Sequence, residues 1–206
     1  MHDGHDHAHP LRPDRDEHPG YYQVMATALR ELLLEKNVFT AEELRRQMEK
    51  MDERGPHLGA RVVARAWADA AFKTRLLADG PAACRELGVD IGPTRLVVLE
   101  NRPELHNLVV CTLCSCYPRA LLGLPPDWYK SVNYRRRAVR EPRAVLEEFG
   151  TRIPDGTAVR VHDSTAELRY IVLPMRPAGA EGLDEAALAA LVTRDAMIGV
   201  ALPKAP

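Results

Sequence analysis

Three of the four cysteines of this chain, Cys111, Cys114 and Cys116, lie in the run CTLCSC at 111–116, called the cysteine loop below. In a strand, the first and last of these sulfur atoms would lie too far apart for one ion, and a helix would turn them to different faces. Only a tight loop directs all three inward. Because three thiolates together favour a soft or borderline transition metal, the spacing predicts a metal site in this loop.

Spacing alone leaves several uses of these thiols open. A tetrahedral zinc site would need a fourth ligand, such as Cys84 or His106, and the chain would then be a zinc-binding structural subunit without catalysis. An iron–sulfur cluster usually takes four cysteines in a recognisable register. A redox disulfide between Cys111 and Cys114 would leave Cys116 without a role. Because one residue separates Cys114 from Cys116, both bind one ion only if the backbone between them presses on it, which makes backbone nitrogens candidate ligands.

The elements that must position this loop are helical at first and mixed afterwards. Apolar residues at helical spacing, capping patterns and breaking glycines predict helices at 21–36, 40–53, 56–70, 71–79, 81–87, 133–139, 142–149 and 184–192, with a short one from Asp127. β-Branched apolar runs predict strands at 94–99, 107–110, 158–161 and 168–173. The second strand runs directly into the cysteines. This order predicts the α+β class.

The patterns divide the chain into three parts. Residues 1–20 hold five of the eight histidines, lack an apolar period and predict a disordered His/Asp-rich tail, either metal-collecting or simply solvated. The helices of residues 21–55 have few apolar residues for their length, so we expect an arm that docks on a partner subunit; the alternative is a hairpin folded on its own domain. Residues 56–206 are expected to form the metal-binding catalytic domain.

Composition excludes several classes of function. The 206 residues carry 28 Lys and Arg against 29 Asp and Glu, a near-neutral balance without the basic footprint of a nucleic-acid-binding protein. No apolar run reaches the roughly 20 residues that span a bilayer, and the polar, acidic N-terminus does not look like a secretory signal. We therefore expect a cytoplasmic protein that binds neither nucleic acid nor membrane, in which clustered thiols are metal ligands rather than disulfides.

The cysteine loop and its surroundings resemble the nitrile hydratase α subunits. Val110–Pro118 (VCTLCSCYP) is similar to the metal claw of that family, and Leu122–Ser131 (LGLPPDWYKS) is similar to the segment that follows the claw. Similar motifs lie in the same order at Val63–Trp67, Asp79–Cys84, Glu167–Tyr170 and Leu191–Asp195. The resemblance covers about residues 20–203. It implies an N-terminal helical arm followed by a mixed α/β layered domain that carries the metal-claw loop.

The resemblance also implies the metal and its ligands. One low-spin Co(III) per chain would be held by the sulfurs of Cys111, Cys114 and Cys116 and by the deprotonated backbone nitrogens of Ser115 and Cys116. A sixth position would take water or substrate. Thr112 stands where iron members of the family carry serine, which favours cobalt over Fe(III). The family oxidises two of the thiolates, so Cys114 would become a sulfinic acid and Cys116 a sulfenic acid.

Such an ion suits the hydration of a nitrile to its amide. A trivalent cation polarises the nitrile nitrogen, or lowers the pKa of a bound water so that hydroxide forms at neutral pH. By the resemblance, the sulfenate oxygen of Cys116 lies beside the open position as nucleophile or base, and both routes stay open. Cys114, Ser115 and Cys116 are the expected catalytic residues, although Ser115 either orients the sulfenate or simply fits a tight turn.

An oxidised, anionic claw needs cationic partners. In the family these arginines come largely from a separate β-type subunit, so the resemblance implies an enzyme that needs this partner for full activity. A cobalt-delivery activator is a further expected partner.

Tyr117-Pro118-Arg119 departs from most nitrile hydratase α subunits, which have tryptophan at the position of Arg119. An arginine there favours a bulky or polar heteroaromatic nitrile as substrate. The same three residues and the run NYRRR at 133–137 look like the γ subunit of thiocyanate hydrolase, which is the alternative; a solvated helix face also explains the arginines of that run. Tyr117, Arg119 and Arg169 are the expected substrate-pocket residues, Arg169 either bonding the claw or packing.

Overall fold

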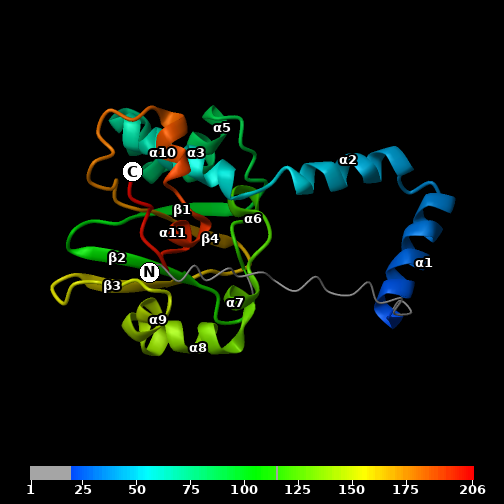
Figure 1. The fold of residues 1–206 in the computed structure, drawn as a ribbon. Helices are drawn as coiled ribbons and strands as arrows, with labels where there is room; N and C mark the ends of the chain where they lie inside the picture. The colour runs from blue at the N-terminus through cyan, green and yellow to red at the C-terminus, as the bar shows by residue number, and fades with distance from the viewer. Residues whose placement is uncertain (1–19, 115) are drawn as a thin grey trace, which may run out of the picture. The chain divides into compact units, whose positions relative to one another are not determined.

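The computed structural model of the chain describes residues 20–114 and 116–206 (Figure 1). The predicted tail therefore lies outside the described residues except for Gly20, and so does the predicted ligand Ser115. The chain divides into two compact units, one that ends at Glu49 and one that runs from Lys50 to Pro206, and each is described by itself. None of the described helices combines the length and the apolar character needed to cross a bilayer.

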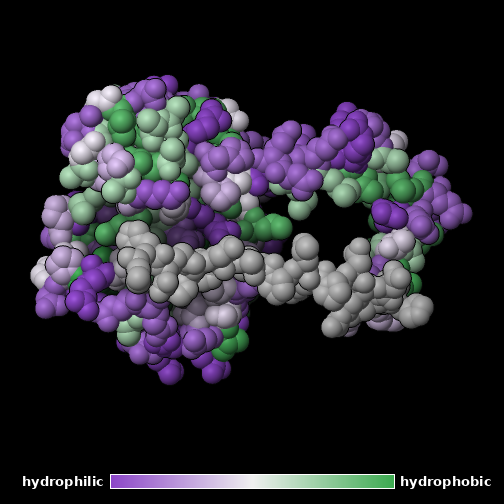
Figure 2. All heavy atoms as spheres, viewed as in Figure 1, coloured by the Kyte–Doolittle hydropathy of each residue, from purple (hydrophilic) through white to green (hydrophobic). Residues whose placement is uncertain are grey.

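The first unit contains two helices, α1 (Tyr21–Glu35) and α2 (Ala41–Asp52), the second of which runs on past the boundary between the units. The capping box expected at the start of α2 is present, because Glu43 N donates to Thr40 Oγ1 at 3.1 Å and Thr40 N donates to the Glu43 carboxylate at 2.7 Å. Neither helix buries a residue. Figure 2 shows hydrophobic residues on the surface of both helices. The exposed aromatic and apolar side chains of these helices include Tyr21, Tyr22, Val24, Met25, Leu29, Leu32 and Met48.

The second unit begins with three helices, α3 (Pro56–Ala68), α4 (Ala70–Ala78) and α5 (Gly80–Glu86). Strands β1 (Arg95–Glu100) and β2 (Leu105–Val110) follow them. The chain then forms α6 (Arg119–Leu122), α7 (Asp127–Lys130), α8 (Val132–Arg140), α9 (Pro142–Glu148), β3 (Ala158–Asp163), β4 (Leu168–Leu173), α10 (Glu185–Ala190) and α11 (Arg194–Ile198). This mixed order confirms the predicted α+β class.

The four strands form two parallel pairs, β1 with β4 and β2 with β3. The register places Val110 opposite Asp163, so the ends of β2 and β3 bring the start of the cysteine loop and residues 163–165 to the same place. Helices α3, α5 and α10 lie on one side of the strands and α8 and α9 on the other (Figure 1). The cysteine loop therefore leaves a layer that is covered on both faces.

A buried polar network joins the strands behind the site. His106, 4% exposed, lies in β2, and its Nε2 donates to the Gly199 carbonyl at 2.7 Å while its Nδ1 lies 3.2 Å from the Asn101 amide nitrogen. Asn107 donates to the Asn101 side-chain oxygen and accepts from His162 Nε2 at 2.9 Å. Because a carbonyl only accepts and the Asn101 amide nitrogen only donates, His106 carries its proton on Nε2, accepts at Nδ1 and is neutral. Burial lowers the pKa of His106 in agreement with this state.

Candidate metal centre

The three clustered sulfur atoms come together as the spacing predicted. Cys111 Sγ lies 3.5 Å from Cys114 Sγ, which lies 3.2 Å from Cys116 Sγ, and all three sulfurs lie within 4.8 Å of one another. The described residues of the cysteine loop form neither helix nor strand, as expected of a tight loop. Cys111 is buried, Cys116 is half-buried and Cys114 is exposed, so the group opens toward the surface.

The sulfur separations fit a common ion with bond angles near 90°. With metal–sulfur bonds of about 2.3 Å, two sulfurs at a right angle lie about 3.3 Å apart, whereas two sulfurs of a tetrahedron lie about 3.8 Å apart. The observed 3.2 Å separation matches the right angle, and the 3.5 Å separation lies between the two values. The donor set thus suits a transition metal, and the separation of Cys114 Sγ from Cys116 Sγ fits the bond angle of a six-coordinate one.

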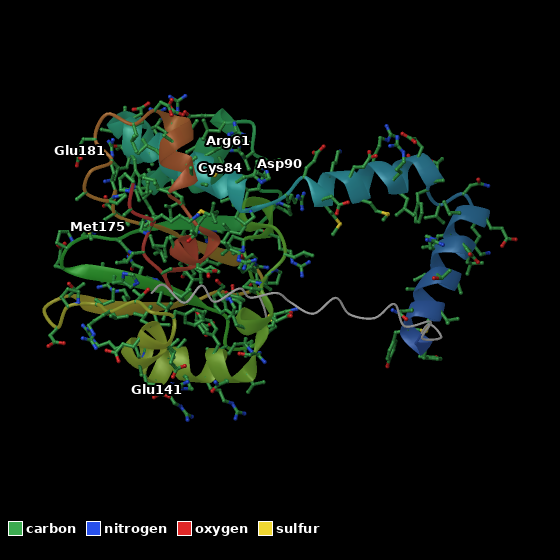
Figure 3. All side chains as sticks on the ribbon, viewed as in Figure 1. Arg61, Cys84, Asp90, Glu141, Met175 and Glu181 are labelled. Carbon is green, nitrogen blue, oxygen red and sulfur yellow. The ribbon has the colours of Figure 1, made fainter. Side chains whose placement is uncertain are left out.

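Neither residue considered as a fourth ligand to zinc joins the sulfurs. Cys84 is fully buried in α5 (Figure 3), and burial raises the pKa of its thiol to about 12, as expected of a small core residue. His106 uses both ring nitrogens in the polar network. Among the described residues, the metal-binding group consists of Cys111, Cys114 and Cys116 alone.

Side chains from two other elements hold the start of the cysteine loop. The Asp163 carboxylate, at the end of β3, accepts from Thr112 N at 2.9 Å and from Thr112 Oγ1 at 2.5 Å. Arg135 of α8 donates to the Thr112 carbonyl at 3.5 Å. Its neighbour Arg137 instead pairs with Glu141 and Glu148, so the arginine run is only partly a solvated face.

Two buried phenols hold the backbone on either side of the sulfurs. Tyr129 of α7 donates to the Cys116 carbonyl at 2.9 Å, and Tyr134 of α8 donates to the Val109 carbonyl at 2.7 Å. Burial raises the pKa of both tyrosines well above the ordinary value for a phenol, so both hydroxyls remain protonated donors. Tyr129 therefore holds the end of the cysteine loop, and Tyr134 holds strand β2 two residues before the loop begins.

The charge of Arg169 reaches the sulfurs from β4. Burial, and then a hydrogen bond to Cys114 and the charge of Cys111, raise the pKa of Cys116 to about 12, while Arg169 acts to lower it. Arg169 itself donates to the Thr165 carbonyl and has no hydrogen bond to a described residue of the loop. The Cys116 thiol therefore keeps its proton at neutral pH, and a bound cation would be needed to make it a thiolate.

The three residues expected to bind substrate line one cavity. Tyr117, Arg119 and Arg169 surround about 250 Å³, together with Arg54 and residues 91–94. Tyr117 is only 4% exposed, and its hydroxyl has no hydrogen-bond partner among the described residues. None of the three metal-binding cysteines lines this cavity. Arg54 had no signal in the sequence, because a lone arginine between two helices cannot be told from a solvated one.

Known proteins resemble this chain over nearly its whole length. The family model described as nitrile hydratase, alpha chain, matches residues 20–201. The cobalt-containing nitrile hydratase subunit alpha of Pseudonocardia thermophila is 48% identical over 198 residues, which are 95% of this chain and 97% of that protein. The thiocyanate hydrolase subunit gamma of Thiobacillus thioparus is 46% identical over 195 residues, which are 89% of this chain and 80% of that protein. The solved structure of a double mutant of the Fe-type nitrile hydratase from Comamonas testosteroni Ni1 matches with a TM-score of 0.82 at 42% identity, covering 90% of this chain and 91% of that one.

Proposed function

We propose a function from one premise: this chain belongs to the nitrile hydratase alpha-chain family. It is the metal-binding catalytic subunit of an enzyme that works as a hetero-oligomer. Its reaction, on our proposal, is the addition of water to the carbon of a C≡N group. The observation that carries this proposal is the group of three sulfurs in one tight loop at the end of two parallel strands.

Residues of this chain would bind the ion and stabilise its oxidised cysteine ligands. Cys111, Cys114 and Cys116 would hold it, with Cys114 as sulfinic acid and Cys116 as sulfenic acid. When bound, a trivalent ion supplies a positive charge that polarises a nitrile or acidifies a water. The guanidinium of Arg169, whose charge lowers the pKa of the unmodified Cys116 thiol, would also stabilise an anionic sulfenate at Cys116. Ser115 is assigned as a ligand and catalytic residue from the family motif alone.

We assign one Co(III) per chain as the metal. Thr112 of the cysteine loop supports cobalt over iron, and the Pseudonocardia relative is named as cobalt-containing. An Fe-type enzyme of similar fold shows that the architecture alone does not select the metal. Delivery of cobalt by an activator protein belongs to the same proposal.

A β-type partner subunit would complete the active site. Leu113, at the tip of the cysteine loop, is 85% exposed, and Cys114 is exposed as well, although an anionic claw works only when it is shielded from water. The arm, residues 21–55, offers a second contact, because neither α1 nor α2 buries a residue within this chain. We therefore place the β-type subunit over the cysteine loop and against the arm, and the catalytic domain at residues 56–206.

The substrate has two candidates. A bulky, polar heteroaromatic nitrile is compatible with an arginine at position 119, where its guanidinium can bond ring nitrogens or hydroxyls of the substrate. The cavity favours the second candidate, thiocyanate, because Arg54, Arg119 and Arg169 place three positive charges around only about 250 Å³. A chain of this second type would be the γ subunit of a thiocyanate hydrolase.

One comparison of products separates the two. The complete hetero-oligomer is given a nucleoside nitrile such as toyocamycin and, separately, thiocyanate, and formation of the amide is compared with release of carbonyl sulfide. Amide from the heteroaromatic nitrile supports the first candidate. Turnover of thiocyanate alone overturns it in favour of the second, and turnover of neither by a cobalt-loaded complex contradicts the proposed reaction.

A further inference from the structure

One aromatic cluster, made of Trp128, Tyr129, Tyr134 and Phe149, contacts the backbone of β2 just before the cysteine loop and the backbone at the end of the loop. The rings of Tyr129 and Tyr134 lie 5.7 Å apart, and Trp128 packs edge-on against Tyr134 at 4.9 Å and Phe149 at 4.7 Å. Tyr129 is fully buried and Tyr134 is 5% exposed. The packed rings therefore hold the hydroxyls of Tyr129 and Tyr134 in place next to the backbone of this region.

The two hydroxyls hold very different carbonyls. Tyr134 bonds Val109, a residue of β2 whose place is already set by the ladder with β3. Tyr129 bonds Cys116, which belongs to neither helix nor strand, and no other hydrogen bond between described residues reaches that carbonyl. The Ser164 hydroxyl, 1% exposed, lies near the Tyr129 hydroxyl and makes no hydrogen bond to the Cys116 carbonyl.

We propose that Tyr129 is a positioning residue of the metal centre, whose hydroxyl fixes the Cys116 backbone and so directs Cys116 Sγ at the other two sulfurs. Cys116 Sγ already lies 3.2 Å from Cys114 Sγ. Rotation of the Cys116 backbone would move this sulfur first, because Cys111 is anchored by β2 and by the neighbouring Thr112–Asp163 bonds. The inference rests on the proposed function only in that the sulfurs hold a metal.

The test compares Tyr129→Phe with Tyr134→Phe in the complete hetero-oligomer. Each variant removes one buried hydroxyl that donates to a backbone carbonyl, so each serves as the stability control for the other. Metal per chain, the sulfur-to-metal absorption bands, thermal unfolding, kcat and KM are measured. Tyr129→Phe is expected to lower metal retention against a chelator about tenfold or more, to shift the absorption bands and to lower kcat with little change in KM. Tyr134→Phe is expected to lose similar thermal stability with an unchanged spectrum.

Equal metal retention and unchanged absorption bands in both variants would overturn the role of Tyr129 and leave it as a core residue. A wild-type complex that carries zinc would contradict the proposed function, yet the same comparison of zinc retention would still decide the role of Tyr129. If Tyr129→Phe does not accumulate as folded protein, 3-fluorotyrosine at position 129 replaces it. This residue keeps the packing and strengthens the donor, so an unchanged spectrum and metal retention again overturn the inference, whereas a shift supports it.

Discussion

Thr112 holds the entrance of the cysteine loop through two bonds to one carboxylate, that of Asp163. The loop therefore has a defined start before any ion binds, and Tyr129 gives it a defined end. A loop that is already shaped does not lose that conformational entropy when metal binds, so we expect these contacts to increase metal affinity without touching the metal.

Removal of the carboxylate should therefore weaken metal binding. We predict that Asp163→Ala lowers the affinity of the complex for its metal by about 10–100-fold, because both bonds to Thr112 are lost. Asp155→Ala, at an exposed carboxylate in a loop away from the site, is the control. Competition with a chelator measures both. Equal affinity of the two variants would show that Asp163 has no part in shaping the loop.

The side chain of Arg119 should distinguish an anionic from a neutral substrate. If thiocyanate is the substrate, Arg119→Leu should raise KM about tenfold or more, because a charge-assisted hydrogen bond contributes about 1.5–3 kcal/mol. For a neutral nitrile, the same variant should change KM little. Arg140→Leu, an exposed arginine at the end of α8, serves as control. A thiocyanate KM that stays at the wild-type value would exclude Arg119 from anion binding.

Among the secondary-structure elements, the register of paired strands brings together residues of the site that are far apart in the sequence. The cysteines are recognisable because they lie within six residues, and β2 and β4 are recognisable from their β-branched runs. The contacts that shape the loop join residues far apart in the chain, 51 positions for Thr112 and Asp163, and they depend on the pairing of β2 with β3. No property of residue 163 by itself could identify it.

The sequence patterns predict no helix after residue 192, yet the structure has helix α11 there. Its five residues, Arg194–Ile198, are too few to show a helical period. The helix exists because Thr193 caps it, its Oγ1 accepting from Ala196 N, and because Ala196, Met197 and Ile198 pack in the core. Tertiary packing therefore stabilises a helix that is too short to be stable from its local sequence alone.

The end of α11 approaches β2 too closely for any side chain. Gly199 has φ +92°, and a Cβ added there would lie 2.0 Å from the Asn107 carbonyl oxygen. We predict that Gly199→Ala costs about 3 kcal/mol or more, from the steric clash added to left-handed backbone strain. Gly92→Ala, at φ +71° with open space around it, should cost only about 1 kcal/mol. Urea unfolding measures both, and equal losses would show that the close approach relaxes freely.

The buried network around His106 should make stability depend on pH. Burial lowers the pKa of His106 and of His162, so the unfolded chain binds more protons than the folded chain in mildly acidic solution. The contribution of these two histidines to the free energy of unfolding is then fully present above their unfolded-state pKa of about 6.5. It is lost as the pH falls through their lower folded-state pKa values. Urea unfolding between pH 7.5 and about 5, above the range where carboxylates titrate, should show this loss.

His106→Gln should weaken that dependence, because glutamine does not titrate. His57→Gln, at an exposed position, should leave it unchanged. If the free energy of unfolding depends on pH equally in both variants, the network around His106 is not the source of that dependence.

At the scale of the whole molecule, the chain has surfaces suited to a partner. The arm exposes apolar residues, and the cysteine loop exposes both Leu113 and Cys114. A structural subunit could leave its metal in water, whereas a nitrile-hydrating site must exclude water from all but the reacting position. The incomplete surface therefore agrees with a hetero-oligomeric enzyme.

The arm can be tested without touching the metal site. We predict that Leu29→Ser with Leu32→Ser weakens association with the β-type subunit by about tenfold or more, since two exposed apolar side chains would lose their partner surface. Arg30→Ser with Glu31→Ser, on the same helix, is the matched control and should change affinity little. Titration calorimetry measures both pairs, and equal affinities would place the partner elsewhere.

The proposed cobalt centre is best tested by the composition of the metal site in the purified complex. X-ray absorption at the metal edge, combined with mass spectrometry of the peptide that contains the cysteine loop, measures it. We predict one cobalt per chain bonded to three sulfurs and to lighter atoms, with two oxygens gained by Cys114 and one by Cys116. Zinc bonded to four ligands, with all three cysteines unmodified, would contradict this prediction.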